Sequence, residues 1–301
     1  MPEKLDQASN FANKLWNASR FVLMNMPEGY KYEKPQIDSS IDNWIISKLN
    51  YIINQTTLNL DRYEFAIAGN ELINFVWNDF CSSYIEFTKS TLLGDDEKAK
   101  KKTLDTLIYV LTAILKLLHP FIPFVTEEIY QAIYGREVSI CKETWPEIMA
   151  ADENKASNID SLNEVIRTVR DIKTENNIKP SKEIQIEFEG LEFSEDIREI
   201  LYKMCKAVST DSITGEKIVR PINNAKLYFR MDEIVNKEEE LLKIEKELSR
   251  LEAEIKRSNG ILSNPKFVDK APKEKVEDER NKLKNYQASY DALLQKKKEL
   301  L

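Results

Sequence analysis

The sequence has little of what most catalytic and metal-binding sites require. Its 301 residues include 1 histidine, 3 cysteines and 7 glycines. The cysteines (Cys81, Cys141 and Cys205) lie far apart and form no C-x-x-C pair, which argues against a zinc site and against a disulfide framework. Few, unpaired cysteines fit a reducing compartment. We therefore predict that the chain binds no metal and that it works in the cytoplasm.

Catalytic motifs are missing as well. The single histidine, His119, stands before Pro120 at the end of a helical pattern, where a packing or capping role is the simpler interpretation. The sequence contains neither a G-x-G-x-x-G loop nor a P-loop. One histidine offers no convincing Ser/His/Asp triad. We predict no catalytic residue in this chain.

Two further absences limit the partners. No apolar run approaches the roughly 18 residues of a membrane span, and the first residues lack the apolar stretch of a signal peptide, so no membrane is expected. The net charge is -7, whereas a protein that coats nucleic acid through charge alone is basic. If the chain binds RNA, it must do so through local patches and shape.

Leu, Lys and Glu are abundant, and they favour a mainly α protein over a sheet protein. Apolar residues recur at helical spacing as far as Trp145-Pro146, and this pattern predicts an antiparallel helix bundle over residues 1–147. The predicted helices cover 5–26, a segment that starts near 40, 62–89, 97–118, and a last segment from 123 or 126 to 134.

The pattern changes twice after the bundle. Residues 148–230 read as a small α+β module. Its predicted elements are helices at 158–176 and 194–207 and strands at 183–188, 217–219 and 226–229. Residues 231–301 carry a heptad of apolar residues in two arms, interrupted at 258–260, 264–265 and 271–272. Two such narrow seams can only bury each other, so we predict an antiparallel coiled-coil hairpin.

The second half of this hairpin is enriched in lysine and arginine. A rigid arm with a basic side can lie along a phosphate backbone even when the whole protein is acidic. A solvated pair of helices laced with salt bridges, or an arm that docks a protein, accounts for the same charges. Charge alone does not decide between these interpretations.

Five segments of the sequence resemble the tRNA-binding half of valyl-tRNA synthetases. Three of them are similar to signatures that the isoleucyl and leucyl enzymes share in looser form: NKLWNASRF at 13–21, WNDFC at 77–81 with YIE at 84–86, and HPFIPFVTEE at 119–128. KPSK at 179–182 resembles the linker module of the valyl enzyme, and LSNPKF at 262–267 resembles the tip of its C-terminal arm. The isoleucyl enzyme typically ends in a zinc module, and this sequence lacks the cysteines for one.

The resemblance implies a fold and a set of partners. It implies a class Ia anticodon-binding domain, a linker module and a coiled-coil arm that grip the anticodon stem-loop and the outer corner of tRNA(Val). ATP and Mg²⁺ would serve a catalytic domain of the same polypeptide, whose H-I-G-H and K-M-S-K-S signatures are missing here. The segment Lys203-Met204-Cys205-Lys206 is only weakly similar to the second signature. We expect a monomeric fragment of a valine–tRNA ligase, without a cofactor and inactive alone.

The resemblance also implies candidate contacts. Asn13, Asn17 and Arg20 follow at i, i+4 and i+7, hence on one helix face, and Trp16 lies in the same cluster although its spacing favours the core. Arg20 either contacts a base or phosphate or forms a salt bridge between helices. The candidates on the arm are Lys266, Lys270, Lys273, Arg280, Lys282 and Lys284. The alternatives are a fragment of an isoleucyl- or leucyl-type synthetase, or a coiled-coil protein-interaction module.

Overall fold

The computed structural model describes residues 2–156, 158–223, 225–234, 237–264 and 272–300. The chain divides into two compact units, residues 1–167 with 192–204, and residues 168–191 with 205–301. The prediction of three parts, with boundaries at 147 and 230, stays a prediction. No helix among the described residues is both long and apolar enough to cross a membrane.

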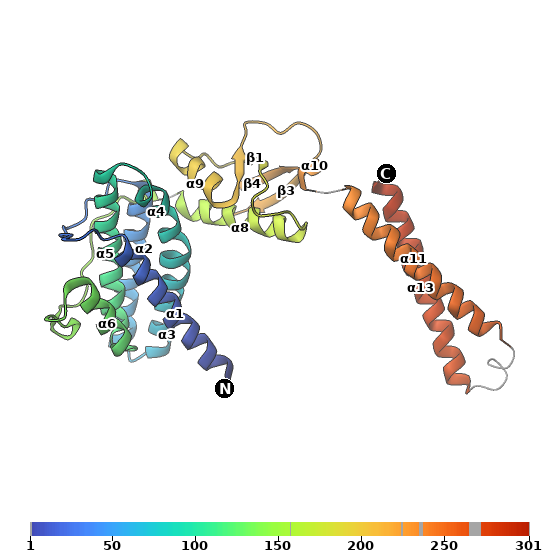
Figure 1. The fold of residues 1–301 in the computed structure, drawn as a ribbon, viewed down its shortest axis with the longest axis horizontal. Helices are drawn as coiled ribbons and strands as arrows, with labels where there is room; N and C mark the ends of the chain where they lie inside the picture. The colour runs from blue at the N-terminus through green and yellow to red at the C-terminus, as the bar shows by residue number, and fades with distance from the viewer. Residues whose placement is uncertain (1, 157, 224, 235–236, 265–271, 301) are drawn as a thin grey trace. The chain divides into compact units, whose positions relative to one another are not determined.

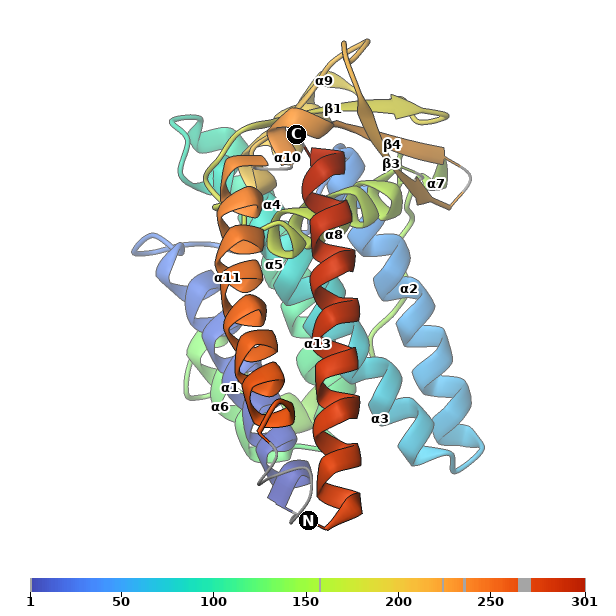
Figure 2. The ribbon, with the colours of Figure 1, turned by 90° about the vertical axis from the view of Figure 1, so that its right-hand side faces the viewer.

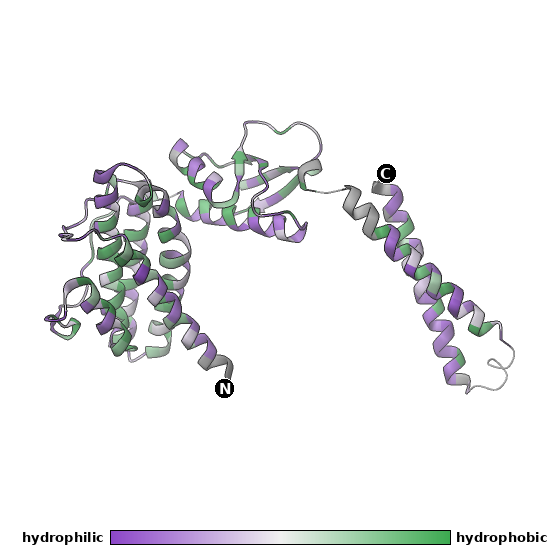
Figure 3. Cartoon of the chain, viewed as in Figure 1, coloured by the Kyte–Doolittle hydropathy of each residue, from purple (hydrophilic) through white to green (hydrophobic). Residues whose placement is uncertain are grey.

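The first unit contains a helix bundle (Figure 1). Its helices are α1 (Pro2–Met24), α2 (Ser40–Asp61), α3 (Phe65–Asn74), η1 (Phe75–Tyr84), α4 (Ile85–Leu92), α5 (Glu97–Leu118) and α6 (Pro123–Tyr134). Helix α5 has buried residues around most of its circumference from Leu104 to Leu118 and contacts α1, α2, α3, α4 and α6. It is therefore the central helix, and Figure 3 shows hydrophobic residues along the helices of the bundle.

The N-terminal ends of α2 and α5 are set by their capping residues. The side chain of Ser39 accepts a hydrogen bond from the backbone N–H of Asp42, and that of Asp96 accepts from the N–H groups of Lys98 and Ala99. Such caps satisfy backbone donors that have no partner inside the helix. The predicted start of α2 and both predicted ends of α5 are confirmed.

The predicted single helix at 62–89 is wrong in one respect. Residues 75–84 form a π-helix between two α-helical stretches. The hydroxyl of Ser82 donates to the carbonyl of Trp77, five residues earlier, at 2.7 Å, and accepts from Nζ of Lys14 at 2.9 Å. The sequence prediction did not separate this π-helical stretch from the α-helices on either side, because the stretch is defined by i→i+5 hydrogen bonds and has no residue signature of its own.

Asp79 lies within this π-helix, and burial raises its pKa to about 6. Because the folded-state pKa lies above the unfolded value of 3.8, the folded protein favours the protonated acid. Stability is then lost as the pH rises from about 4 to about 6, by roughly 2–3 kcal/mol. We expect Asp79→Asn to stabilise the bundle by about 2 kcal/mol near neutral pH and by little near pH 4. Urea unfolding followed by tryptophan fluorescence measures this.

The matched control is Asp95→Asn, which changes an exposed aspartate in the turn before α5. It should leave the unfolding free energy unchanged at both pH values. An equal gain for Asp79→Asn at both pH values would contradict the role assigned to its charge.

The first unit also holds the short helices η2 (Ile140–Lys142) and α7 (Glu153–Ala156), part of α8 (Ile159–Glu175) and most of α9 (Glu195–Cys205). Amide side chains of α2 fasten the segment before α7. Asn50 exchanges hydrogen bonds of 2.6 and 2.9 Å with the backbone of Met149, and Asn43 accepts from the N–H of Asp152 at 2.7 Å. The indole of Trp44 donates to Asp160 of α8 at 2.9 Å.

The second unit contains a mixed sheet in the order β2-β1-β4-β3. Its strands are β1 (Ile184–Glu189), β2 (Ala207–Ser209), β3 (Lys217–Ile222) and β4 (Ala225–Arg230). Strand β1 pairs in parallel with β2 and antiparallel with β4, which also pairs antiparallel with β3. The predicted alternation in β1 is confirmed, because Ile184 and Ile186 are buried. Strand β2 was not predicted; Lys206, at φ +53°, ends α9 before Ala207, which the sequence placed in the helix.

The C-terminal part of this unit comprises α10 (Met231–Ile234), α11 (Lys237–Leu262) and α13 (Lys273–Leu300). Helices α11 and α13 lie side by side (Figure 2). Lys297 pairs with Glu245 at 2.6 Å, and the Ser258 hydroxyl donates to Glu279 at 2.8 Å, so the two helices run antiparallel. The break predicted at 258–260 is wrong, because α11 continues through Gly260 to Leu262. The breaks predicted at 264–265 and 271–272 lie between the end of α11 and the start of α13, and residues 265–271 lie outside the described residues.

Candidate nucleic-acid interface

A groove of about 510 Å³ lies between α1 and the η1–α4 segment. Asn13 and Asn17 line it from α1, so the structure brings these two predicted residues to one site. Lys14 lies between them, with Nζ 4.5 Å from the centre of the Trp77 ring. Lys89 lines the groove from α4 and pairs with Glu86 at 2.6 Å. We call this groove, which is lined by amide groups, ammonium groups and an indole, the α1 groove.

Trp16 and Arg20 are both exposed on α1. The sequence favoured a core position for Trp16, and this is wrong, because 47% of its surface is accessible. Leu15 and Ser19 fill the buried positions beside it. Within the described part of the chain, no carboxylate pairs with Arg20, so the cluster of Asn13, Trp16, Asn17 and Arg20 offers its polar and aromatic atoms to solvent.

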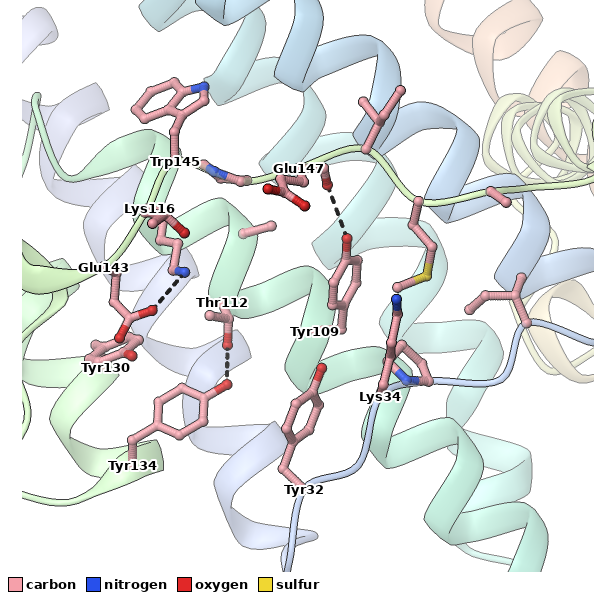
Figure 4. Close-up of a pocket in the computed structure, with 18 residues that line it drawn as sticks. Tyr32, Lys34, Tyr109, Thr112, Lys116, Tyr130, Tyr134, Glu143, Trp145 and Glu147 are labelled. Atoms are coloured by element: carbon pink, nitrogen blue, oxygen red, sulfur yellow. Dashed lines mark hydrogen bonds and ion pairs between the residues drawn. The ribbon is translucent and has the colours of Figure 1, made fainter.

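A second hollow, of about 730 Å³, was not found from the sequence (Figure 4). Its walls come from residues 32–37, α5, α6 and residues 143–150, and Tyr32, Tyr109, Tyr130 and Tyr134 line it. Lys34 and Lys116 add ammonium groups, of which Lys116 pairs with Glu143 at 2.9 Å. Burial raises the pKa of the Tyr32 and Tyr130 hydroxyls, so both remain neutral. Aromatic faces beside cations suit a planar base with its phosphate.

Exposed aromatic residues at the helix ends were also not predicted as contacts. Tyr63 is 81% accessible in the turn between α2 and α3, and its ring lies edge-on to that of Phe65, with ring centres 6.2 Å apart. Phe124, in the first turn of α6, is 89% accessible. An aromatic ring in water is a platform on which an unpaired base can stack. Helical spacing alone cannot separate such rings from core residues.

The basic candidates on the arm are only partly described. Lys266 and Lys270 lie outside the described residues, and Lys273 begins α13 with its side chain outside the described part. Arg280, Lys282 and Lys284 are exposed on α13, and Lys282 lies 3.7 Å from Glu279 of the same helix. Figure 3 shows many hydrophilic residues along both helices. The exposed positions of these three side chains make them accessible to a polyanion.

Comparisons with known proteins match both regions. Residues 42–188 match the family model described as the anticodon-binding domain of tRNA ligase, and residues 236–300 match that of the valyl tRNA synthetase tRNA binding arm. A valine–tRNA ligase of Bacillus cereus is 40% identical over 98% of this chain and 35% of its own length. Those of Bacillus subtilis and Clostridium tetani are 37% and 36% identical over 99% of the chain.

The chain thus spans about a third of the length of the curated relatives it matches, 35% for the Bacillus cereus protein. Both family models concern tRNA binding, and one of them is specific to valyl enzymes. The first match runs from α2 into β1 and so covers the bundle except α1, and the second covers the antiparallel pair α11–α13. The chain therefore belongs to the valyl-tRNA synthetase family and corresponds to its anticodon-binding domain and tRNA-binding arm.

Proposed function

We propose that this chain is the part of a valine–tRNA ligase that holds tRNA(Val) during ATP-dependent aminoacylation. The observation that carries the proposal is the presence, in one chain, of an anticodon-binding domain and of an arm specific to valyl enzymes. The proposed partners are tRNA(Val) and a catalytic domain of the same polypeptide, in a monomeric cytoplasmic protein. ATP and Mg²⁺ belong to that catalytic domain in this proposal.

The bundle would bind the anticodon stem and loop. Bases in an RNA loop are unstacked, so a protein can stack aromatic rings on them and bond their edges. The α1 groove supplies amide groups and an indole, while Arg20 supplies an exposed cation on the same helix α1. Discrimination between anticodons requires such groups, because phosphate contacts are the same in every tRNA.

The pair α11–α13 would form a coiled coil that reaches the outer corner of the tRNA, where the D and T loops meet. The buried residues Ile244, Leu251 and Val276 fall on the predicted apolar seam. The charged residues Glu245, Lys246, Arg250 and Glu252 of α11 are exposed. A long rigid pair of helices can present cations to a phosphate backbone without a basic net charge. We therefore assign Arg280, Lys282 and Lys284 to phosphate contacts that add affinity and fix orientation.

Binding to a panel of tRNAs tests the proposal. We expect the chain to bind a tRNA with a valine anticodon about 5- to 150-fold more tightly than tRNAs with isoleucine or leucine anticodons, since one good base contact contributes about 1–3 kcal/mol. Filter binding at two salt concentrations measures the affinities. Preference for another member of the panel would favour a sibling synthetase, and no tRNA binding would favour a protein-interaction module.

Arg20→Ala in the same assay tests the assignment to the anticodon. It should reduce the preference for the valine anticodon while helicity is unchanged. Lys98→Ala, which removes a cation from an exposed position on α5, is the control and should leave the preference intact. Equal preference for both variants would return Arg20 to a structural role.

A further inference from the structure

We infer that His119, Cys141 and Glu127 form a binding site for a thiolate- and imidazole-preferring divalent metal ion such as Zn²⁺. The ligand atoms of the three side chains lie within 4.8 Å of one another. The sequence predicted no metal site, because these residues are 8 to 22 positions apart in the chain and follow no zinc-ligand spacing. The inference does not depend on tRNA binding.

The hydrogen bonds of Thr126 select the tautomer of His119 that can bind a metal ion through Nε2. The Thr126 hydroxyl lies 3.1 Å from the carbonyl oxygen of Ile122 and 3.0 Å from that of Pro123, so its single hydrogen is donated to the backbone. It therefore accepts a hydrogen bond at 2.8 Å from Nδ1 of His119. The neutral ring then carries its lone pair on Nε2, the atom that faces Cys141. Metal-bound histidines are oriented in this way by a partner on the other ring nitrogen.

The thiol of Cys141 lies at a suitable distance from this lone pair. The separation of Nε2 and Sγ is 3.3 Å. A tetrahedral zinc ion, with bonds of about 2.0 Å to nitrogen and about 2.3 Å to sulfur, holds two such atoms roughly 3.5 Å apart. Helix η2 carries Cys141, and the Ser139 hydroxyl accepts the Cys141 N–H at its first turn. The thiol is exposed, so an ion can reach it from solvent.

Glu127 supplies the third ligand from the first turns of α6. One carboxylate oxygen accepts from the side chain of Gln131 at 2.7 Å, and the other accepts from the N–H of Ile140 at 3.2 Å. The second bond holds the carboxylate beside the turn that carries Cys141. Its ligand oxygen lies within 4.8 Å of the ligand atoms of His119 and Cys141, and water would complete a fourth position. A bound ion would fasten η2 to the α5–α6 corner.

Cobalt titration of the tag-free chain tests the site. Co²⁺ serves as the spectroscopic probe because it takes the same tetrahedral ligands as zinc and gives a thiolate charge-transfer band. We expect a 1:1 band that Zn²⁺ abolishes by competition, together with a higher thermal unfolding temperature in Zn²⁺, since a ligand of the folded state stabilises it. Cys141→Ser should remove the band, and Thr126→Val should weaken Co²⁺ binding about tenfold or more.

Cys81→Ala is the matched control. Cys81 is buried, and burial raises the pKa of its thiol to about 12, so its removal should leave the band unchanged. The absence of a charge-transfer band in the parent chain, or a band that survives Cys141→Ser, would overturn the inference. A band lost only in Cys81→Ala would assign the metal to another thiol and overturn it equally.

Discussion

Replacing Arg280, Lys282 and Lys284 together by glutamine is expected to weaken tRNA binding at least about tenfold at moderate salt. The three side chains are exposed on α13, and each lysine or arginine near a phosphate releases condensed counterions when it binds. The loss should be similar for every tRNA, because phosphates carry no sequence information. Filter binding over a range of salt concentrations measures both the affinity and its salt dependence.

The salt dependence makes this experiment specific. Removing three phosphate contacts should reduce the slope of log K against log salt by about 2–3. The control replaces Lys98, Lys142 and Lys179 by glutamine, which removes the same charge from exposed positions outside α11 and α13. If both triple variants lose the same affinity, net charge and not the arm is responsible; an unchanged slope would exclude these residues as RNA contacts.

Lys173→Met should destabilise the sheet unit by roughly 3 kcal/mol. The Lys173 side chain, on α8, is only 3% accessible. Its ammonium donates to the backbone carbonyls of Pro180, Lys182 and Cys205, at 3.1, 2.6 and 2.7 Å. Burial lowers the pKa of Lys173, and these three hydrogen bonds offset the cost of burying its positive charge. Methionine keeps the volume of the side chain but leaves the three carbonyls without this donor.

Amide hydrogen exchange locates the effect. Roughly 3 kcal/mol corresponds to about a hundredfold faster exchange through opening of the unit, and we expect it in peptides from β1 and β4. Trp16, Trp44, Trp77 and Trp145 all lie in the first unit, so tryptophan fluorescence should report an unchanged bundle. Lys179→Met, at an exposed position nearby, should alter neither signal. Slow exchange in both variants would show that the three bonds contribute little.

Patterns of neighbouring residues in the sequence predicted most helices and strands of this protein. Helix α5 was predicted end to end because Asp96 caps it and Pro120 follows its last turn. Strand β1 was predicted because Ile184 and Ile186 alternate with polar residues. Strand β2 was not, because Ala207–Ser209 is too short to show a period and is held by pairing with β1, which lies some 20 residues earlier in the chain.

The sequence by itself determined the family, the helical character of the bundle and the basic candidates on the arm, since short motifs and periodic spacing are written in neighbouring residues. Only the tertiary structure decided that Trp16 is exposed, that four tyrosines line one hollow, and that His119, Glu127 and Cys141 meet. These features join side chains from separate helices and turns. Their positions depend on how α5 and α6 pack and on the path of the segment that follows α6. No pattern of neighbouring residues predicts either one.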